Sequence, residues 1–256
     1  MATLVSTQGQ LAVEIAGIAL GATRDTETAP KSKAPTPAHL NKPMELCLSS
    51  TESTLLRQLI TYPEKAIYAP SGKASTYEDP YVKLYQKLIN ASGLLPGKHI
   101  PENGIYDQAM MGNVQRLQNS LLKHHMGAKE LATQCSGSTT FAALATLLHD
   151  QGQLHFQDQQ ISEAWQSVMP LVRGLGTKEG GVDRINYSNE FVDNSSQQRE
   201  RITAAKAVLQ ALGHENATLK ESIKEFQRQQ GLTSDGCAGA NTVRKLIAQF
   251  LELKLS

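Results

Sequence analysis

Histidine and cysteine are among the residue types in this 256-residue chain that could bind a metal or act as nucleophiles. The seven histidines show no common spacing: His39, His99, His124, His125, His149, His155 and His214. None lies in an HExxH pattern, which places two zinc ligands on one face of a helix. The three cysteines, Cys47, Cys135 and Cys237, form neither CxxC pairs nor clusters with histidine. We therefore expect no metal site and no cofactor.

Two carboxylates, Glu179 and Asp193, are the weak candidates for acid–base catalysis. Lys178–Gly181 reads KEGG, which is similar to the glutamate-glycine-glycine start of some phage-type lysozymes. A glycosidase holds two carboxyl groups about 5–9.5 Å apart around the bond it cleaves. The segment between the flanking helical regions is too short for a lysozyme cleft, so a non-catalytic protein is favoured and Glu179 remains the weak candidate.

Charge and hydropathy exclude two broad classes of protein. Lys and Arg number 25 against 24 Asp and Glu, a net charge of +1. An extended nucleic-acid surface normally needs a clear basic excess, so no nucleic-acid partner is expected. No run approaches the ~20 apolar residues that cross a bilayer, so no membrane span is expected either.

The N-terminal region differs in composition from the rest. Residues 11–20 read LAVEIAGIAL, but Glu14 interrupts this run and no Lys or Arg precedes it, unlike a secretory signal. Residues 25–43 contain four prolines and little that could be buried, which is typical of an extended linker. A short helix is predicted within residues 46–60. Residues 1–77 are thus an arm that could contact a protein partner.

Apolar residues recur with helical spacing in two stretches, each made of three segments. In the first stretch they are Val82, Tyr85, Leu88 and Ile89, then Met110, Val114, Leu117 and Leu121, then Phe141, Leu144, Ala145 and Leu148. In the second they are Ile202, Ala205, Val208 and Leu209, then Leu219, Ile223 and Phe226, then Val243, Leu246, Ile247 and Phe250.

The two stretches also agree position by position. The shared positions are Gly93 and Gly213, VQRLQ (114–118) and IKEFQ (223–227), and Cys135-x-Gly137-x-x-Thr140 and Cys237-x-Gly239-x-x-Thr242. This agreement predicts an internal repeat of one three-helix unit.

Local signals define several helix ends. Thr218 and Glu221 have capping-box spacing, and Asp107 can cap the helix that follows it. Between the two units, the spacing around Trp165 predicts one further helix, which Pro170 should end or kink.

Phe226–Leu246 reads FQRQQGLTSDGCAGANTVRKL, a Phe-Gln pair followed by GL-x-x-DG-x-x-G-x-x-T. This pattern resembles the peptidoglycan-binding domain, a three-helix module of bacterial cell-wall enzymes, over roughly residues 198–251. Leu94–Gln118 is similar to the first half of the same pattern, but Asn103 and Asp107 replace its aspartate and second glycine, and Gln134-Cys135 replaces its second Asp-Gly. We interpret this stretch as a divergent copy.

The resemblance implies a mainly α fold with two three-helix units joined by a helix-plus-loop connector and a flexible N-terminal arm. The expected divisions are 1–77, 78–150, 151–197 and 198–256. It also implies binding of peptidoglycan through its stem peptides and sugars. The candidate ligand-binding residues are Gln115, Gln118, Gln227, Arg228, Asp235 and Thr242. Asp235 also suits a tight turn, and Thr242 also suits a helix cap.

Three functions remain open at this point. The first is non-catalytic recognition of the cell wall, which targets the protein to the periplasm or envelope, by specialised secretion or phage delivery. The second is a structural or assembly component of a phage tail or secretion apparatus. The third is a peptidoglycan hydrolase or secreted toxin with an unrecognised active site.

Overall fold

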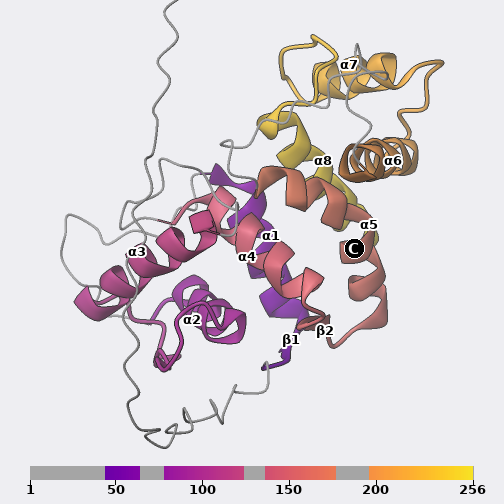
Figure 1. Ribbon diagram of the computed structural model, residues 1–256. Coiled ribbons are helices and arrows are strands. Elements are labelled where there is room, and N and C mark those ends of the chain that lie inside the picture. The colour runs from indigo at the N-terminus through magenta and orange to yellow at the C-terminus, as the bar shows by residue number, and fades with distance from the viewer. Residues whose placement is uncertain (1–43, 64–77, 124–135, 177–195, 256) are drawn as a thin grey trace, which may run out of the picture. The chain divides into compact units, whose positions relative to one another are not determined.

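The computed structural model describes residues 44–63, 78–123, 136–176 and 196–255. These residues are mainly helical, as the sequence predicts, and all belong to one compact unit (Figure 1). The elements are β1 (Leu46–Leu48), α1 (Ser50–Thr61), α2 (Pro80–Ser92), α3 (Gln108–Lys123), α4 (Ser138–Asp150), β2 (Leu154–Phe156), α5 (Gln159–Leu175), α6 (Ser196–Ala211), α7 (Leu219–Gln229) and α8 (Ala240–Leu255).

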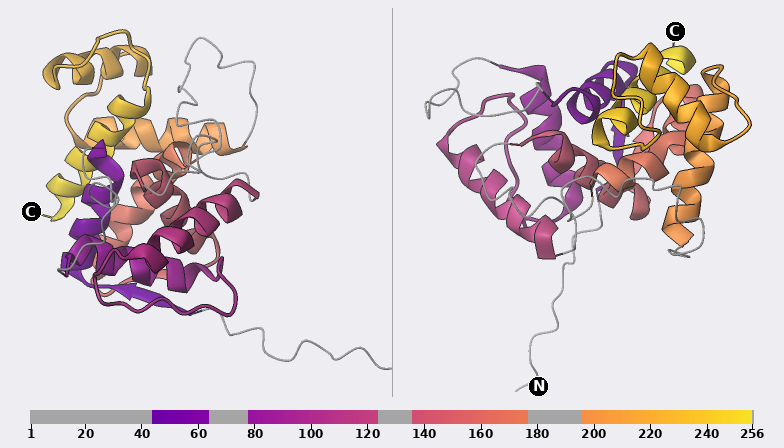
Figure 2. Two further views of the ribbon diagram at one scale, coloured as in Figure 1. Left: turned by 90° about the vertical axis from the view of Figure 1, so that its left-hand side faces the viewer. Right: turned by 90° about the horizontal axis from the view of Figure 1, so that it is seen from above.

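Four helices form the centre of this unit. Helices α1 and α5 each pack against both α4 and α8, and their apolar faces meet in one core. Helices α2 and α3 lie on one side of this centre, and α6 and α7 lie on the other (Figures 1 and 2). The fully buried side chains of the four central helices include Leu56, Ile60, Phe141, Leu144, Trp165, Val168, Leu246 and Leu251.

A short parallel strand pair, which was not predicted from the sequence, joins the first half of the described chain (β1 to α4) to the second half (β2 to α8). The register pairs Leu46 with Leu154, Cys47 with His155 and Leu48 with Phe156. Three-residue strands are too short for a period-two pattern to be recognised in a sequence. Each strand leads directly into a helix, β1 into α1 and β2 into α5.

The helix caps predicted at Thr218 and Asp107 are present, whereas Thr242, the cap expected for the last helix, lies inside α8. Thr218 and Glu221 form a reciprocal capping box at the start of α7, and Asp107 accepts a 2.7 Å hydrogen bond from the backbone N–H of Met110. Ser49 and Glu52 form a second capping box that begins α1. These bonds satisfy N–H groups that the first turn of a helix leaves without backbone partners.

Pro170 does not end the connector helix, which was one of the two outcomes, an end or a kink, that the sequence predicts. Helix α5 continues to Leu175 with Pro170 inside it. An internal proline costs about 3 kcal/mol because it removes a backbone hydrogen bond. The following turn buries Leu171, Val172 and Leu175 against the core, and that burial offsets the lost bond.

Candidate functional site

The side-chain amide of Gln227, on α7, fixes the loop that leads to α8. Its Nε2 donates to Asp235 Oδ1 at 3.0 Å, to the Cys237 carbonyl at 2.9 Å and to Thr242 Oγ1 at 3.2 Å. Its Oε1 accepts a 2.9 Å bond from the N–H of Gly236. We call these five residues the Gln227 cluster.

The cluster requires a tight turn at Asp235-Gly236. Asp235 Oδ1 also accepts the N–H of Cys237 at 2.8 Å, and Gly236 has φ of 76°. A Cβ at Gly236 would lie 2.7 Å from Lys220 Cγ and 3.2 Å from the Lys220 carbonyl oxygen. The loop is therefore closely packed on α7, and glycine supplies both the left-handed conformation and the space.

Burial separates the sequence candidates of the C-terminal unit into two groups. Gln227 is 2% exposed and Thr242 is 4% exposed, and both use their polar atoms within the cluster. They hold the loop in shape rather than presenting groups to a ligand. Asp235 lies at the surface, and the side chain of Arg228 is 65% exposed and contacts Glu225.

Sequence reasoning missed Arg244, on the second turn of α8. Burial lowers the pKa of its guanidinium, because the surroundings disfavour the charge. Its Nη1 donates to Asn241 Oδ1 at 3.2 Å. Among the described residues its buried Nε has no hydrogen-bond acceptor and the guanidinium has no carboxylate within ion-pair distance. A lone arginine in a sequence gives no signal for this environment.

A second cluster of the same kind joins α2 to the loop before α3. Gln86 Nε2 donates to Asn103 Oδ1 at 2.9 Å and to the Ile105 carbonyl at 3.1 Å, and its Oε1 accepts the N–H of Gly104 at 2.8 Å. Asn103 Oδ1 accepts the N–H of Ile105 at 3.0 Å, and Gly104 has φ of 71°. We call these four residues the Gln86 cluster.

The Gln86 cluster was not among the sequence candidates. In the sequence, this cluster is indicated by the Asn103-Gly104 pair, a dipeptide typical of turns, which follows the predicted helix that contains Gln86. Of the candidates on α3, Gln115 is exposed, whereas Gln118 is 1% exposed and lies in the core. The structure therefore leaves Gln115 at the surface and encloses Gln118.

The Gln227 cluster lies within the segment of the chain that matches a known family. Residues 198–246 match the family model described as a putative peptidoglycan binding domain. The match includes most of α6, all of α7 and the loop that Gln227 holds. It supports peptidoglycan binding at a general level for this part of the chain. No curated protein and no solved structure matches the chain significantly.

Other sequence candidates are placed as follows. Glu179, Asp193 and Cys135 lie outside the described residues, as does the stretch LAVEIAGIAL. Cys47 is exposed and Cys237 is partly buried, and both are free thiols. Within the described ranges, no three His, Cys, Asp or Glu side chains gather as metal ligands, and no helix is long and apolar enough to span a membrane.

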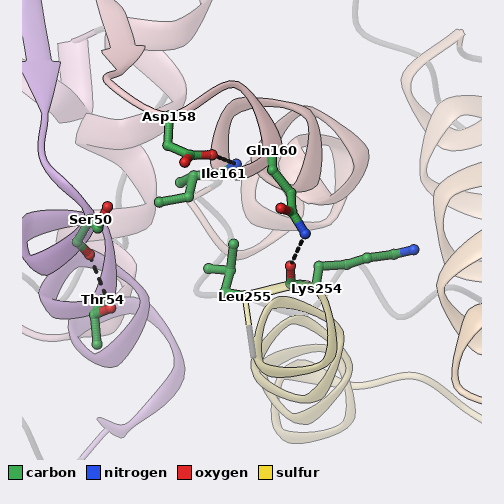
Figure 3. Close-up of a pocket in the computed structure, with 7 residues that line it drawn as sticks. All are labelled: Ser50, Thr54, Asp158, Gln160, Ile161, Lys254 and Leu255. Atoms are coloured by element: carbon green, nitrogen blue, oxygen red, sulfur yellow. Dashed lines mark hydrogen bonds between the residues drawn. The ribbon is translucent and has the colours of Figure 1, made fainter.

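A pocket of about 330 Å³ lies where α1 and α5 begin and α8 ends (Figure 3). The polar groups around it satisfy helix ends. Asp158 accepts the N–H of Ile161 at 3.0 Å, and Gln160 Nε2 donates to the Lys254 carbonyl at 2.9 Å. The first bond caps α5 and the second joins α5 to α8, so both polar side chains have partners without a ligand.

Proposed function

We propose that this chain recognises bacterial peptidoglycan without cleaving it, through the surface formed by α7, the loop at residues 231–239 and the start of α8. The match of residues 198–246 to the peptidoglycan-binding family carries this proposal. The Gln227 cluster supports it, because it fixes the backbone of this loop before any ligand arrives. A preformed site loses less conformational entropy on binding than a mobile loop.

Arg228 and Arg244 are the groups that we assign to the ligand. Stem peptides of peptidoglycan carry carboxylates, and the fork of an arginine forms strong paired hydrogen bonds with a carboxylate. Arg228 is exposed near the end of α7. Arg244 has no carboxylate partner among the described residues, so an anionic ligand would compensate for the burial of its charge.

Residues 78–150 are, in this proposal, a divergent second copy of the same unit. The positions that VQRLQ (114–118) shares with IKEFQ (223–227) support this relationship. The Gln86 cluster makes the same kinds of bonds as the Gln227 cluster, but from the first helix of its unit rather than from the middle helix. Binding would target the protein, or a partner attached through residues 1–77, to the cell wall. That function places it in the periplasm or envelope.

Co-sedimentation with purified sacculi tests the proposal. The full chain should pellet with sacculi, and mass spectrometry of the supernatant should find no released muropeptides. Arg228→Glu and Arg244→Gln should each reduce the pelleted fraction. Lys254→Glu is the matched control, because Lys254 is exposed at the far end of α8 from the loop, about 20 Å away at 1.5 Å per residue.

The same assay distinguishes the two competing functions. Released muropeptides that disappear in a Glu179→Gln variant would establish a hydrolase and overturn the non-catalytic proposal. A chain that neither pellets nor releases fragments would overturn wall binding. A pull-down with the full chain as bait, compared with a chain that lacks residues 1–43, would then test the assembly role.

A further inference from the structure

The similarity between the two halves extends beyond the three helices of the family module. Each three-helix region is preceded by a strand and a helix, β1 and α1 in the first half and β2 and α5 in the second. Both helices begin at a side-chain cap, Ser49 in α1 and Asp158 in α5. The order strand, helix and then three helices therefore occurs twice in the described residues.

The buried positions of these helices also correspond. Buried residues occupy the same sequence positions relative to the two caps. They are Leu56, Leu59 and Ile60 after Ser49 in α1, and Trp165, Val168 and Met169 after Asp158 in α5. Counted from Gly137 and Gly239, the same holds for Phe141, Leu144, Ala145 and Leu148 in α4, and Val243, Leu246, Ile247 and Phe250 in α8. One pattern of core residues thus serves both halves.

The packing between the halves is reciprocal. Between the halves, α1 packs on α8 and α5 packs on α4. Within the halves, α1 packs on α4 and α5 packs on α8. The parallel strands pair first residue with first, Leu46 with Leu154, and last with last, Leu48 with Phe156. Exchanging the halves therefore maps these helix contacts onto one another, which is the relationship found in a two-fold symmetric dimer. The two halves have the geometry of a dimer fused into one chain.

This arrangement places the two middle helices, α3 and α7, on opposite sides of the central helices (Figures 1 and 2). Each middle helix has an exposed arginine, Arg116 on α3 and Arg228 on α7. Gln115 and Asn119 are also exposed on α3, within one turn of Arg116. The first half therefore presents a cationic and amide-bearing surface on α3.

We infer that the α3 surface of residues 78–123 is a second binding site for carboxylate-bearing stem peptides, and that the chain binds the wall at two points at once. This inference rests on the proposed function of the C-terminal unit. A rigid link between two sites makes the second contact intramolecular, which raises the overall affinity by about 10²–10⁴ over one site alone. Each unit can then bind weakly while the whole chain is retained on a polymeric wall.

The experiment compares the full-length chain with Arg116→Glu, Arg228→Glu, the double variant and the Lys254→Glu control, all titrated with intact sacculi. Each single variant should weaken apparent binding by at least about tenfold, because either change removes the gain from two-point attachment. The double variant should fall to background, and the control should bind as the unchanged chain does. Arg116→Lys, which keeps the charge, should retain more binding than Arg116→Glu.

The outcomes separate this inference from the proposed function. If Arg228→Glu abolishes binding while Arg116→Glu binds as the unchanged chain does, wall binding stands and the second site is refuted. If the unchanged chain does not bind sacculi, both are refuted. A circular dichroism melt of Arg116→Glu checks that the variant is folded. If its melting temperature is unchanged, a loss of binding is caused by the altered α3 surface and not by unfolding.

Discussion

The indole Nε1 of Trp165 donates a 2.7 Å hydrogen bond to Oγ of Ser53, and both residues are fully buried. The bond joins α5 to α1, the two helices that occupy corresponding places in the halves of the molecule. Phe156 stacks on the same indole with ring centroids 5.5 Å apart. The chain's single tryptophan is therefore located at the junction of its two halves.

Removal of the Ser53 hydroxyl should destabilise the whole unit. Ser53→Ala leaves the buried indole N–H without its acceptor, which costs about 1–3 kcal/mol. Urea denaturation followed by Trp165 fluorescence measures this loss directly. Ser167→Ala is the control, because its exposed hydroxyl bonds only the Glu163 carbonyl on the same helix. Equal stability of the two variants would contradict the role of the bond.

Replacement of Gln227 should weaken the C-terminal loop. Gln227→Leu keeps the side-chain bulk but leaves the buried N–H of Gly236 unsatisfied, so we expect a loss of about 1–3 kcal/mol. Gln229→Leu, two residues further along α7, is the control, since the Gln229 amide is exposed and bonds Glu225 at 3.1 Å. Hydrogen exchange at Gly236 and Cys237 should rise in Gln227→Leu alone. Unchanged exchange there would refute the assigned function of the amide.

Two glycine substitutions should change stability in opposite directions. A Cβ at Gly176, where α5 ends, would lie 2.7 Å from Ala143 N and 2.8 Å from Ala143 Cα, both backbone atoms of α4. Gly176→Ala should therefore destabilise the packing of α5 on α4. At Gly112 in α3 nothing lies within 4 Å, so Gly112→Ala should stabilise by about 0.5–1 kcal/mol through helix propensity. Thermal melts of both variants test the pair, and a shift of the same sign in both would be inconsistent with these contacts.

Acid should weaken the contact between α1 and α2. Burial raises the pKa of Glu52, but the bonded Lys87 ammonium and Ser49 outweigh it, so the pKa lies below the ordinary 4.5. The carboxylate of Glu52 binds a proton more readily in the unfolded chain than in the folded one. The stabilisation that it gives to the folded state is therefore complete above pH 4.5 and is lost as the pH falls through the pKa of the folded state. Glu52→Gln should lower stability at pH 7 and flatten the decline below pH 4.5. Unfolding by urea between pH 3 and pH 7 measures both effects, and an unaltered pH profile would contradict the assignment.

The sequence by itself determined the helices and their core faces. Helical spacing of residues such as Val114, Leu117 and Phe226 identified the segments, because an amphipathic helix must repeat its apolar positions every three to four residues. The capping box of Thr218 and Glu221 and the Asp-Gly turn were also recognisable, since their bonds join residues only a few positions apart. The loop motif identified the family that residues 198–246 match.

Tertiary structure decided which candidate residues reach solvent and how the halves meet. Gln118 and Gln227 look like surface amides in a sequence, but both are buried in the folded chain, and the loop after α7 encloses the amide of Gln227. The pairing of β1 with β2 and the Trp165–Ser53 bond join residues more than a hundred positions apart. No local pattern encodes such contacts, because they form only when two separately folded helical faces share one core.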